Sequence, residues 1–197
     1  MITTPKDQIT DSLRGRILAR ELGPGHRVKE EALAVEFGVG RGPIRDVVLR
    51  LSKEGYLLAH PNKGASVNAL PNSDVRSLFL HTRRDLEILA LRKGFPTWKL
   101  DDLPKLDRIL REFRVAAEMN DLAEVIRHDV AFHRFIVERY PGNGLSILWL
   151  PLMTTLALPY SRHANLLESH AEHVAIYQSL ADGDARAAAA LLKQHIQ

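Results

Sequence analysis

Apolar residues recur at helical spacing through the first fifty positions of the chain. Ile9, Leu13 and Ile17 lie four residues apart, and two shorter segments carry an apolar stripe of the same period. Gly38 follows the first of these segments in the place of a C-cap, and Pro43 lies in the first turn of the next, where its missing N–H costs nothing. The pattern predicts three helices, over residues 4–21, 29–37 and 41–55.

Short β-prone stretches follow these helices. Residues 56–59 and 65–67 flank His60-Pro61-Asn62-Lys63-Gly64, which is rich in turn-forming residues, so the segment predicts a β-hairpin. Residues 68–73 are polar, contain a proline and have the character of a connector. We therefore expect a domain boundary near residue 70.

The chain beyond this connector has helical character throughout. Glycine, proline and Asn-Asp breaks divide it into six predicted helices, over residues 72–93, 101–119, 121–139, 144–158, 160–182 and 184–196. The predicted fold class is mainly α, with a small helix-and-hairpin domain in residues 1–70 and an all-helical bundle in residues 71–197.

Charge is distributed unevenly between these two parts. Residues 1–70 carry 11 Lys and Arg against 8 Asp and Glu, whereas residues 71–197 carry 16 of each, so the basic excess belongs to the first domain. The absence of cysteine excludes disulfides, thiolate metal sites and cysteine nucleophiles. No apolar run approaches the ~20 residues that span a bilayer, and the N-terminus lacks a signal-like core. We expect a soluble cytoplasmic protein that does not enter a membrane.

The two short helices and the hairpin predict a reader of the DNA major groove, a winged helix-turn-helix. Arg41 and Arg45 lie four residues apart at the start of the second short helix, where their guanidinium groups can meet guanine edges or phosphates. Arg50 lies further along this helix, where we expect it to contact phosphates. Lys63 and Gly64 lie at the tip of the hairpin, where we expect them to approach the minor groove or its phosphates. The alternative is that these arginines form an ordinary solvated helix face.

The same stretch resembles the winged helix-turn-helix of the GntR regulators. The features that match are Pro24-Gly25, Glu31-x-Leu33-Ala34, Phe37-Gly38-Val39, Arg41-x-Pro43-Ile44-Arg45-Asp46, Leu51, Glu54-Gly55 and Gly64. Where these regulators commonly have Ser-Arg-Thr-Pro, this chain has Gly40-Arg41-Gly42-Pro43 and lacks two hydroxyls that often contact DNA. The resemblance implies binding of operator DNA, but it does not carry over an operator sequence.

Residues 72–197 resemble the effector domain of the FadR subfamily, the FCD type, in its VanR-like six-helix branch. The matching features are Arg83-x-x-Leu86-Glu87, Asp129-x-x-x-His133, Asn143-x-x-Leu, Glu172-His173, Gly183-Asp184 and His195. The resemblance implies a small carboxylate effector bound over a divalent metal ion, and a carboxylate with neutral imidazoles suits an ion of the Zn, Ni or Mn type. It also implies the metal ligands, which are Asp129, His133, His173 and His195.

Helical spacing agrees with this ligand set. Asp129 and His133 are at i and i+4 on one face of a helix, and His173 and His195 come from later helices that can converge in a bundle. His170 is the alternative to His173. Arg83 and Arg162 are candidates for a bidentate contact with the effector's carboxylate, although solvated helix arginines are the commoner case.

The sequence thus predicts a homodimeric transcription regulator, a repressor, that binds double-stranded operator DNA and senses a small carboxylate. Two alternatives remain from other classes: a metal-dependent hydrolase that uses the four metal ligands, and an architectural DNA-binding protein without an effector. No general base or oxyanion arrangement is recognisable in the sequence, so we expect that the protein is not an enzyme.

Overall fold

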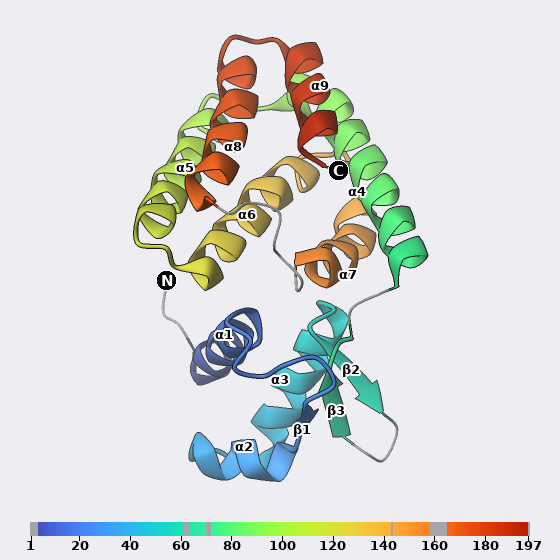
Figure 1. Cartoon of the computed structure of the whole chain (residues 1–197), viewed down its shortest axis with the longest axis vertical. Coiled ribbons are helices and arrows are strands. Elements are labelled where there is room, and N and C mark those ends of the chain that lie inside the picture. The colour runs from blue at the N-terminus through green and yellow to red at the C-terminus, as the bar shows by residue number, and fades with distance from the viewer. Residues whose placement is uncertain (1–3, 61–63, 70–71, 143, 158–164, 197) are drawn as a thin grey trace. The chain divides into compact units, whose positions relative to one another are not determined.

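The computed structural model describes residues 4–60, 64–69, 72–142, 144–157 and 165–196. The chain forms two compact units, Met1–Leu70 and Pro71–Gln197 (Figure 1). Within the described ranges, no helix is both long and apolar enough to cross a membrane.

The described part of the first unit combines three helices with a small antiparallel sheet. Its elements are α1 (Pro5–Leu18), β1 (Arg27–Val28), α2 (Glu30–Glu36), α3 (Arg41–Lys53), β2 (Leu57–His60) and β3 (Gly64–Val67). The strand order is β1-β3-β2, so the predicted hairpin is extended by one strand from before α2. The sequence pattern did not reveal β1, because two residues are too short to show an alternation.

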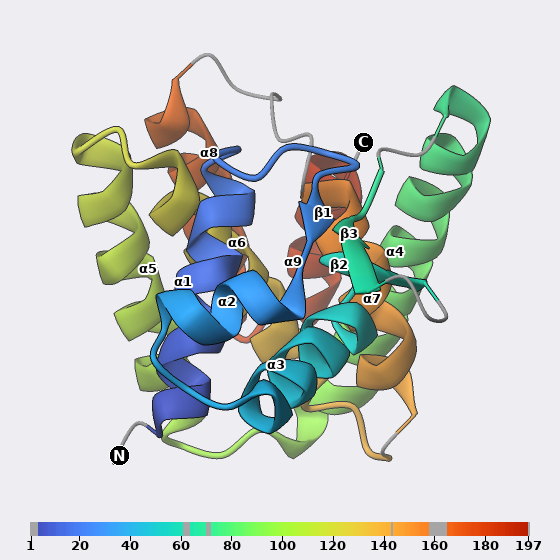
Figure 2. The same cartoon turned by 90° about the horizontal axis from the view of Figure 1, so that it is seen from below.

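Local signals set the ends of these helices. Thr4 caps α1 in a reciprocal capping box with Asp7, and Gly38 between α2 and α3 has a positive φ of 64°. α1, α2 and β2 all pack on α3 (Figure 2). The buried residues of α3 are Ile44, Val47, Val48 and Leu51. The winged helix-turn-helix predicted from the sequence is confirmed.

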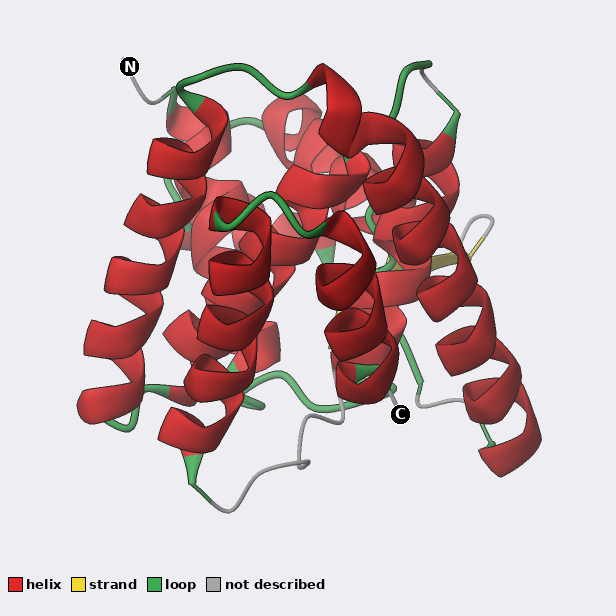
Figure 3. Ribbon diagram, turned by 90° about the horizontal axis from the view of Figure 1, so that it is seen from above, coloured by secondary structure: helices red, strands yellow, loops and turns green. Residues whose placement is uncertain are grey.

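Over its described residues, the second unit is a bundle of six α-helices (Figure 3). They are α4 (Ser73–Gly94), α5 (Asp102–Glu118), α6 (Leu122–Val137), α7 (Leu145–Ala157), α8 (Leu166–Ala181) and α9 (Ala185–His195), with a 3-10 turn at Phe95–Thr97 after α4. The predicted mainly α fold is confirmed. The predicted start of the fifth helix of this bundle, residues 160–164, lies outside the described residues.

α6 occupies the middle of the bundle and contacts α4, α5 and α7. It buries residues on more than one face, because apolar side chains such as Phe132 and Ile136 alternate with buried polar ones, Asp129 and His133. α8 presents a narrower buried stripe, with Ser169, His173, Ile176 and Leu180 at helical spacing. The helices thus deliver polar side chains into an otherwise apolar core.

Candidate nucleic-acid interface and metal centre

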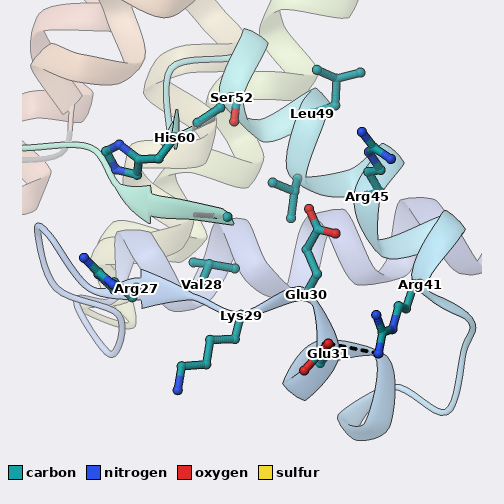
Figure 4. A pocket seen from close by; sticks show the side chains of 13 residues that line it. Arg27, Val28, Lys29, Glu30, Glu31, Arg41, Arg45, Leu49, Ser52 and His60 are labelled. Carbon is teal, nitrogen blue, oxygen red and sulfur yellow. Dashed lines mark ion pairs between the residues drawn. The ribbon is translucent and has the colours of Figure 1, made fainter. Parts of the chain in front are cut away.

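A groove with a volume of about 840 Å³ lies in the first unit, between the start of α3, β1 and the hairpin. Arg41 and Arg45 contribute from α3, and Arg27 and Lys29 from the other side (Figure 4). Two carboxylates, Glu30 and Glu31, also line it. The groove therefore presents four cationic side chains and two carboxylates, and the excess of positive charge suits a polyanion.

The two predicted recognition arginines differ in their partners. Arg41 Nη2 lies 2.9 Å from Glu31 Oε1, and both side chains are 73% exposed. Arg45 is exposed and has no ion-pair partner within the described part of the chain. Arg45 is thus available to a ligand directly, whereas Arg41 is held on one side by a carboxylate (Figure 4).

Sequence reasoning missed Arg27 and Lys29. In the sequence they flank Val28, and in the structure Val28 is buried while its two neighbours are exposed; all three line the groove. The corresponding signal in the sequence is the alternation of a cationic, an apolar and a cationic residue. Three residues are too few for this alternation to predict a strand.

The other predicted DNA-contacting residues are placed differently. Arg50 does not line the groove; its guanidinium pairs with Asp7 of α1 at 2.8 Å and with Glu54 at 3.1 Å. Gly64 lines the groove with a φ of +77°, and a Cβ there would lie 3.1 Å from the carbonyl oxygen of Val28. The backbone geometry of β3 therefore explains this glycine. Lys63 lies outside the described residues.

Four buried polar side chains meet in the second unit: Asp129 and His133 of α6, His173 of α8 and His195 of α9. His133 Nε2 lies 3.1 Å from His195 Nε2 and 3.2 Å from His173 Nε2. Asp129 Oδ1 lies 3.2 Å from His173 Nε2 and 4.0 Å from His133 Nε2. The structure thus brings together the four residues that the sequence predicted as metal ligands.

The opposite nitrogen of each imidazole has a partner that can only accept a hydrogen bond. His133 Nδ1 lies 2.6 Å from Glu87 Oε2, His195 Nδ1 lies 2.6 Å from Glu172 Oε2, and His173 Nδ1 lies 2.7 Å from the carbonyl oxygen of Ser169. Each ring therefore donates from Nδ1. In the neutral imidazole this leaves the lone pair on Nε2, which points toward the centre of the group.

Burial lowers the pKa of His133 and brings that of His195 well below its usual value, so these two rings are neutral near pH 7. Burial alone would raise the pKa of Asp129, but its close contact with His173 and the nearby positive charge of Arg83 hold the pKa below its usual range. The Nε2 lone pairs of His133 and His195 therefore face each other at 3.1 Å, beside the carboxylate of Asp129. A positive charge at the centre of these groups would stabilise them.

The donor set fits a divalent transition-metal ion. Donors bound at about 2.0–2.1 Å and at angles of about 90–110° lie roughly 2.9–3.4 Å apart, as three of the four distances above do. Imidazole nitrogens with one carboxylate oxygen suit Zn²⁺, Ni²⁺ or similar ions. His170 does not belong to this group; its Nε2 lies 3.2 Å from the carbonyl oxygen of Leu110.

Arg83 lies one turn before Glu87 on α4 and is only 8% exposed. Its Nε donates to Glu87 Oε1 at 2.8 Å, but its Nη2 is buried without a hydrogen-bond partner among the described residues. An unpaired guanidinium nitrogen in a buried setting calls for an acceptor. Arg162, the second predicted effector-binding arginine, lies outside the described residues.

Two family models match the chain. Residues 5–67 match "Bacterial regulatory proteins, gntR family", and residues 79–197 match the FCD domain. The boundary between these matches falls at the connector between the two units.

Curated relatives and solved structures agree with these matches. The chain is 32% identical over 132 residues to the uncharacterized HTH-type transcriptional regulator YdhC of Bacillus subtilis, covering 66% of this chain and 58% of the relative. It is 26% identical to the HTH-type transcriptional repressor RspR of Escherichia coli, covering 66% and 57%. The chain thus spans less than two thirds of either relative's length. The solved structure of McbR/YncC from E. coli superposes with a TM-score of 0.79, covers 100% of this chain and 95% of that one, and at 21% identity shows the shared fold.

Proposed function

Because the chain belongs to the GntR family of bacterial regulatory proteins and carries an FCD domain, we propose that it is a DNA-binding transcription regulator that responds to a metal-bound small carboxylate. The groove between α3, β1 and the hairpin is the proposed DNA-reading surface, and the bundle is the proposed sensor. The matched families and relatives are regulators rather than enzymes, so a metal-dependent hydrolase is not the function that they support.

One observation carries the sensory part of this proposal: three Nε2 atoms and one carboxylate oxygen converge in a buried core. Asp129, His133, His173 and His195 would hold a divalent metal ion. When bound, this ion would supply a Lewis-acid centre with open positions for an anionic ligand.

The charges around this centre favour an anionic effector. Asp129 and Glu87 contribute two negative charges and Arg83 one positive charge, all in buried positions. A divalent ion would bring these groups to a net charge of +1. Arg83 Nη2 supplies a free donor for a carboxylate. An architectural DNA-binding protein would need neither feature.

We further propose that two copies bind a palindromic operator and that the effector changes the spacing of their α3 helices, as a repressor released by its ligand requires. One small reader supplies few specific contacts alone, and a relative, RspR, is named a repressor. The proposed assembly is a cytoplasmic homodimer of the FadR subfamily.

The test is to select genomic fragments with the full chain loaded with Zn²⁺ and then add acetate, succinate or citrate. We expect a selected palindromic fragment to be released by at least one of these acids, and only from the metal-loaded protein. The DNA-reading proposal is overturned if no fragment is enriched. The sensory proposal is overturned if an enriched fragment stays bound with every acid and with a wider carboxylate panel.

Arg83→Lys is expected to weaken binding of the active carboxylate by about tenfold or more, because lysine keeps the charge but lacks the forked donors. Calorimetric titration of the zinc-loaded protein measures this. Arg84→Lys, a neighbour on the same helix whose side chain is 24% exposed, is the control and should bind as wild type does. Equal affinities of the two variants would remove Arg83 from the effector site.

Glu31→Gln is expected to raise the affinity for random DNA by about two- to fivefold, since it removes a negative charge from the groove. It should also narrow the difference between operator and random DNA, because Arg41 loses the partner that orients it. Fluorescence anisotropy with both DNAs measures the two effects. Glu21→Gln, the same charge change outside the groove, should alter neither affinity.

A further inference from the structure

Glu87 is a fully buried carboxylate that joins three helices of the bundle. Its Oε2 accepts from His133 Nδ1 of α6 at 2.6 Å. Its Oε1 accepts from Arg83 Nε of α4 at 2.8 Å and from Trp149 Nε1 of α7 at 2.7 Å. One side chain outside the four proposed ligands thus touches a ligand, the proposed effector arginine and a neighbouring helix.

The charge on this carboxylate fixes the direction of all three hydrogen bonds. Glu87 Oε1 lies 2.8 Å from Nε of the Arg83 guanidinium, which is always charged, and this ion pair holds the buried carboxylate in its ionised form. An ionised carboxylate has no proton to donate. Arg83, Trp149 and His133 must therefore all donate, and for His133 the proton lies on Nδ1.

The Nδ1 partners of the three imidazoles are not equivalent. His173 faces a backbone carbonyl, which no side-chain substitution removes, and His195 faces Glu172, whose side chain is 36% exposed. Only His133, of these three, faces a carboxylate with no exposure at all. The Nε2 atom of His133 also lies within 3.2 Å of the Nε2 atoms of both other rings.

We propose that Glu87 is the positioning residue that makes His133 a metal ligand, by holding its proton on Nδ1 and its Nε2 lone pair toward the other three ligands. This inference rests on the proposed metal site. It assigns to α4 an indirect part in metal binding, through a carboxylate that also accepts hydrogen bonds from Arg83 and Trp149.

Glu87→Gln tests this assignment because it changes the charge and the donor pattern without changing the shape. A glutamine has one oxygen, and two donors meet at the Oε1 position, so the oxygen should stay with Arg83 and Trp149. The amide NH₂ then faces His133 Nδ1, which must accept. The proton moves to Nε2, and His133 no longer has a lone pair for the metal.

The experiment is a competition titration of Zn²⁺ against a chelating dye, with the full-length protein and its Glu87→Gln variant. We expect the variant to bind Zn²⁺ about 10- to 100-fold more weakly, the usual effect of losing a partner of a ligating histidine. Trp149→Phe is the control, because it removes another donor from the same carboxylate but leaves its bond to His133. It should retain zinc affinity within about threefold.

A second measurement needs no metal. Nitrogen-15 NMR of the histidines in metal-free wild type at neutral pH should show His133 protonated on Nδ1, and the Glu87→Gln variant should show it on Nε2. His133 protonated on Nε2 in wild type, or equal zinc affinities of wild type and Glu87→Gln, would overturn the role of Glu87 while leaving the metal site intact. A wild type that binds none of Zn²⁺, Ni²⁺ or Mn²⁺ would overturn both.

Discussion

Replacing Arg41 and Arg45 together with alanine is expected to lower the affinity for operator DNA by roughly 100-fold or more. A well-placed arginine contact to a base contributes about 1–3 kcal/mol, and about 1.4 kcal/mol corresponds to tenfold in affinity. Both side chains are exposed at the start of α3 and line the same groove. Anisotropy titrations with operator and random DNA at several salt concentrations would measure the loss.

Arg50→Ala is the matched control for this prediction. Arg50 lies on the same helix, but its guanidinium pairs with Asp7 and Glu54 and does not line the groove. Removing the Arg50 side chain should leave the operator affinity within about twofold. Its ion pairs contribute about 0.2–1 kcal/mol to folding stability, and they make no contact with DNA. If Arg50→Ala weakened binding as much as the double variant, the DNA-reading surface would extend over the α1 side of α3.

The salt dependence separates two ways in which the arginines can act. If they bind phosphates, the slope of log K against log salt should become less negative by roughly 0.9 for each phosphate that the variant no longer neutralises. If they read bases, the slope should change little and the preference for operator over random DNA should fall. The ion pair with Glu31 fixes one side of Arg41, which favours base reading for that residue. Arg45, without such a partner among the described residues, is better suited to phosphate.

Helical periodicity together with local end signals was sufficient to predict the architecture. The periodicity identifies the helices, and capping residues mark where many of them begin. Thr4, Asn72, Asp121, Asn165 and Asp184 each cap the start of a helix with a side-chain oxygen. What periodicity could not show was the two-residue strand β1. Its pairing with β3 is a long-range contact, and Arg27 and Lys29 were missed with it.

The candidate metal group was predictable for a related reason. Asp129 and His133 share a helix face by spacing alone, and His173 lies on the buried stripe of α8. The choice between His170 and His173 depended on how α8 packs, which the sequence did not settle. His195, close to the last residue of the chain, is 6% exposed beside Ile196, which is 2% exposed. The role of Glu87 needed side-chain geometry, although its spacing of four residues from Arg83 was visible.

Removing the metal is expected to lower the melting temperature of the helical unit by roughly 5–10 °C. An ion present at about 100 times its Kd stabilises the folded state by about 2.7 kcal/mol, and 1 kcal/mol shifts the melting temperature of a protein of this size by about 2–4 °C. We expect this stabilisation because the metal separates the Nε2 lone pairs of His133 and His195, which otherwise repel each other in a site where all four ligands are buried. Differential scanning calorimetry with and without a chelator measures the shift.

The double variant His133→Ala, His173→Ala should show no such shift and, by elemental mass spectrometry, no bound metal, against about one ion per wild-type chain. His170→Ala is the matched control, since His170 is on the same helix as His173 but binds the carbonyl oxygen of Leu110. It should keep both the metal and the full temperature shift. The comparison uses the metal-dependent increment and not the melting temperature itself, because an alanine in the core also leaves a cavity that destabilises each variant with or without metal. If His170→Ala abolished the increment and the double variant kept it, the ion would lie elsewhere on α8, and the convergence of the three Nε2 atoms would need another explanation.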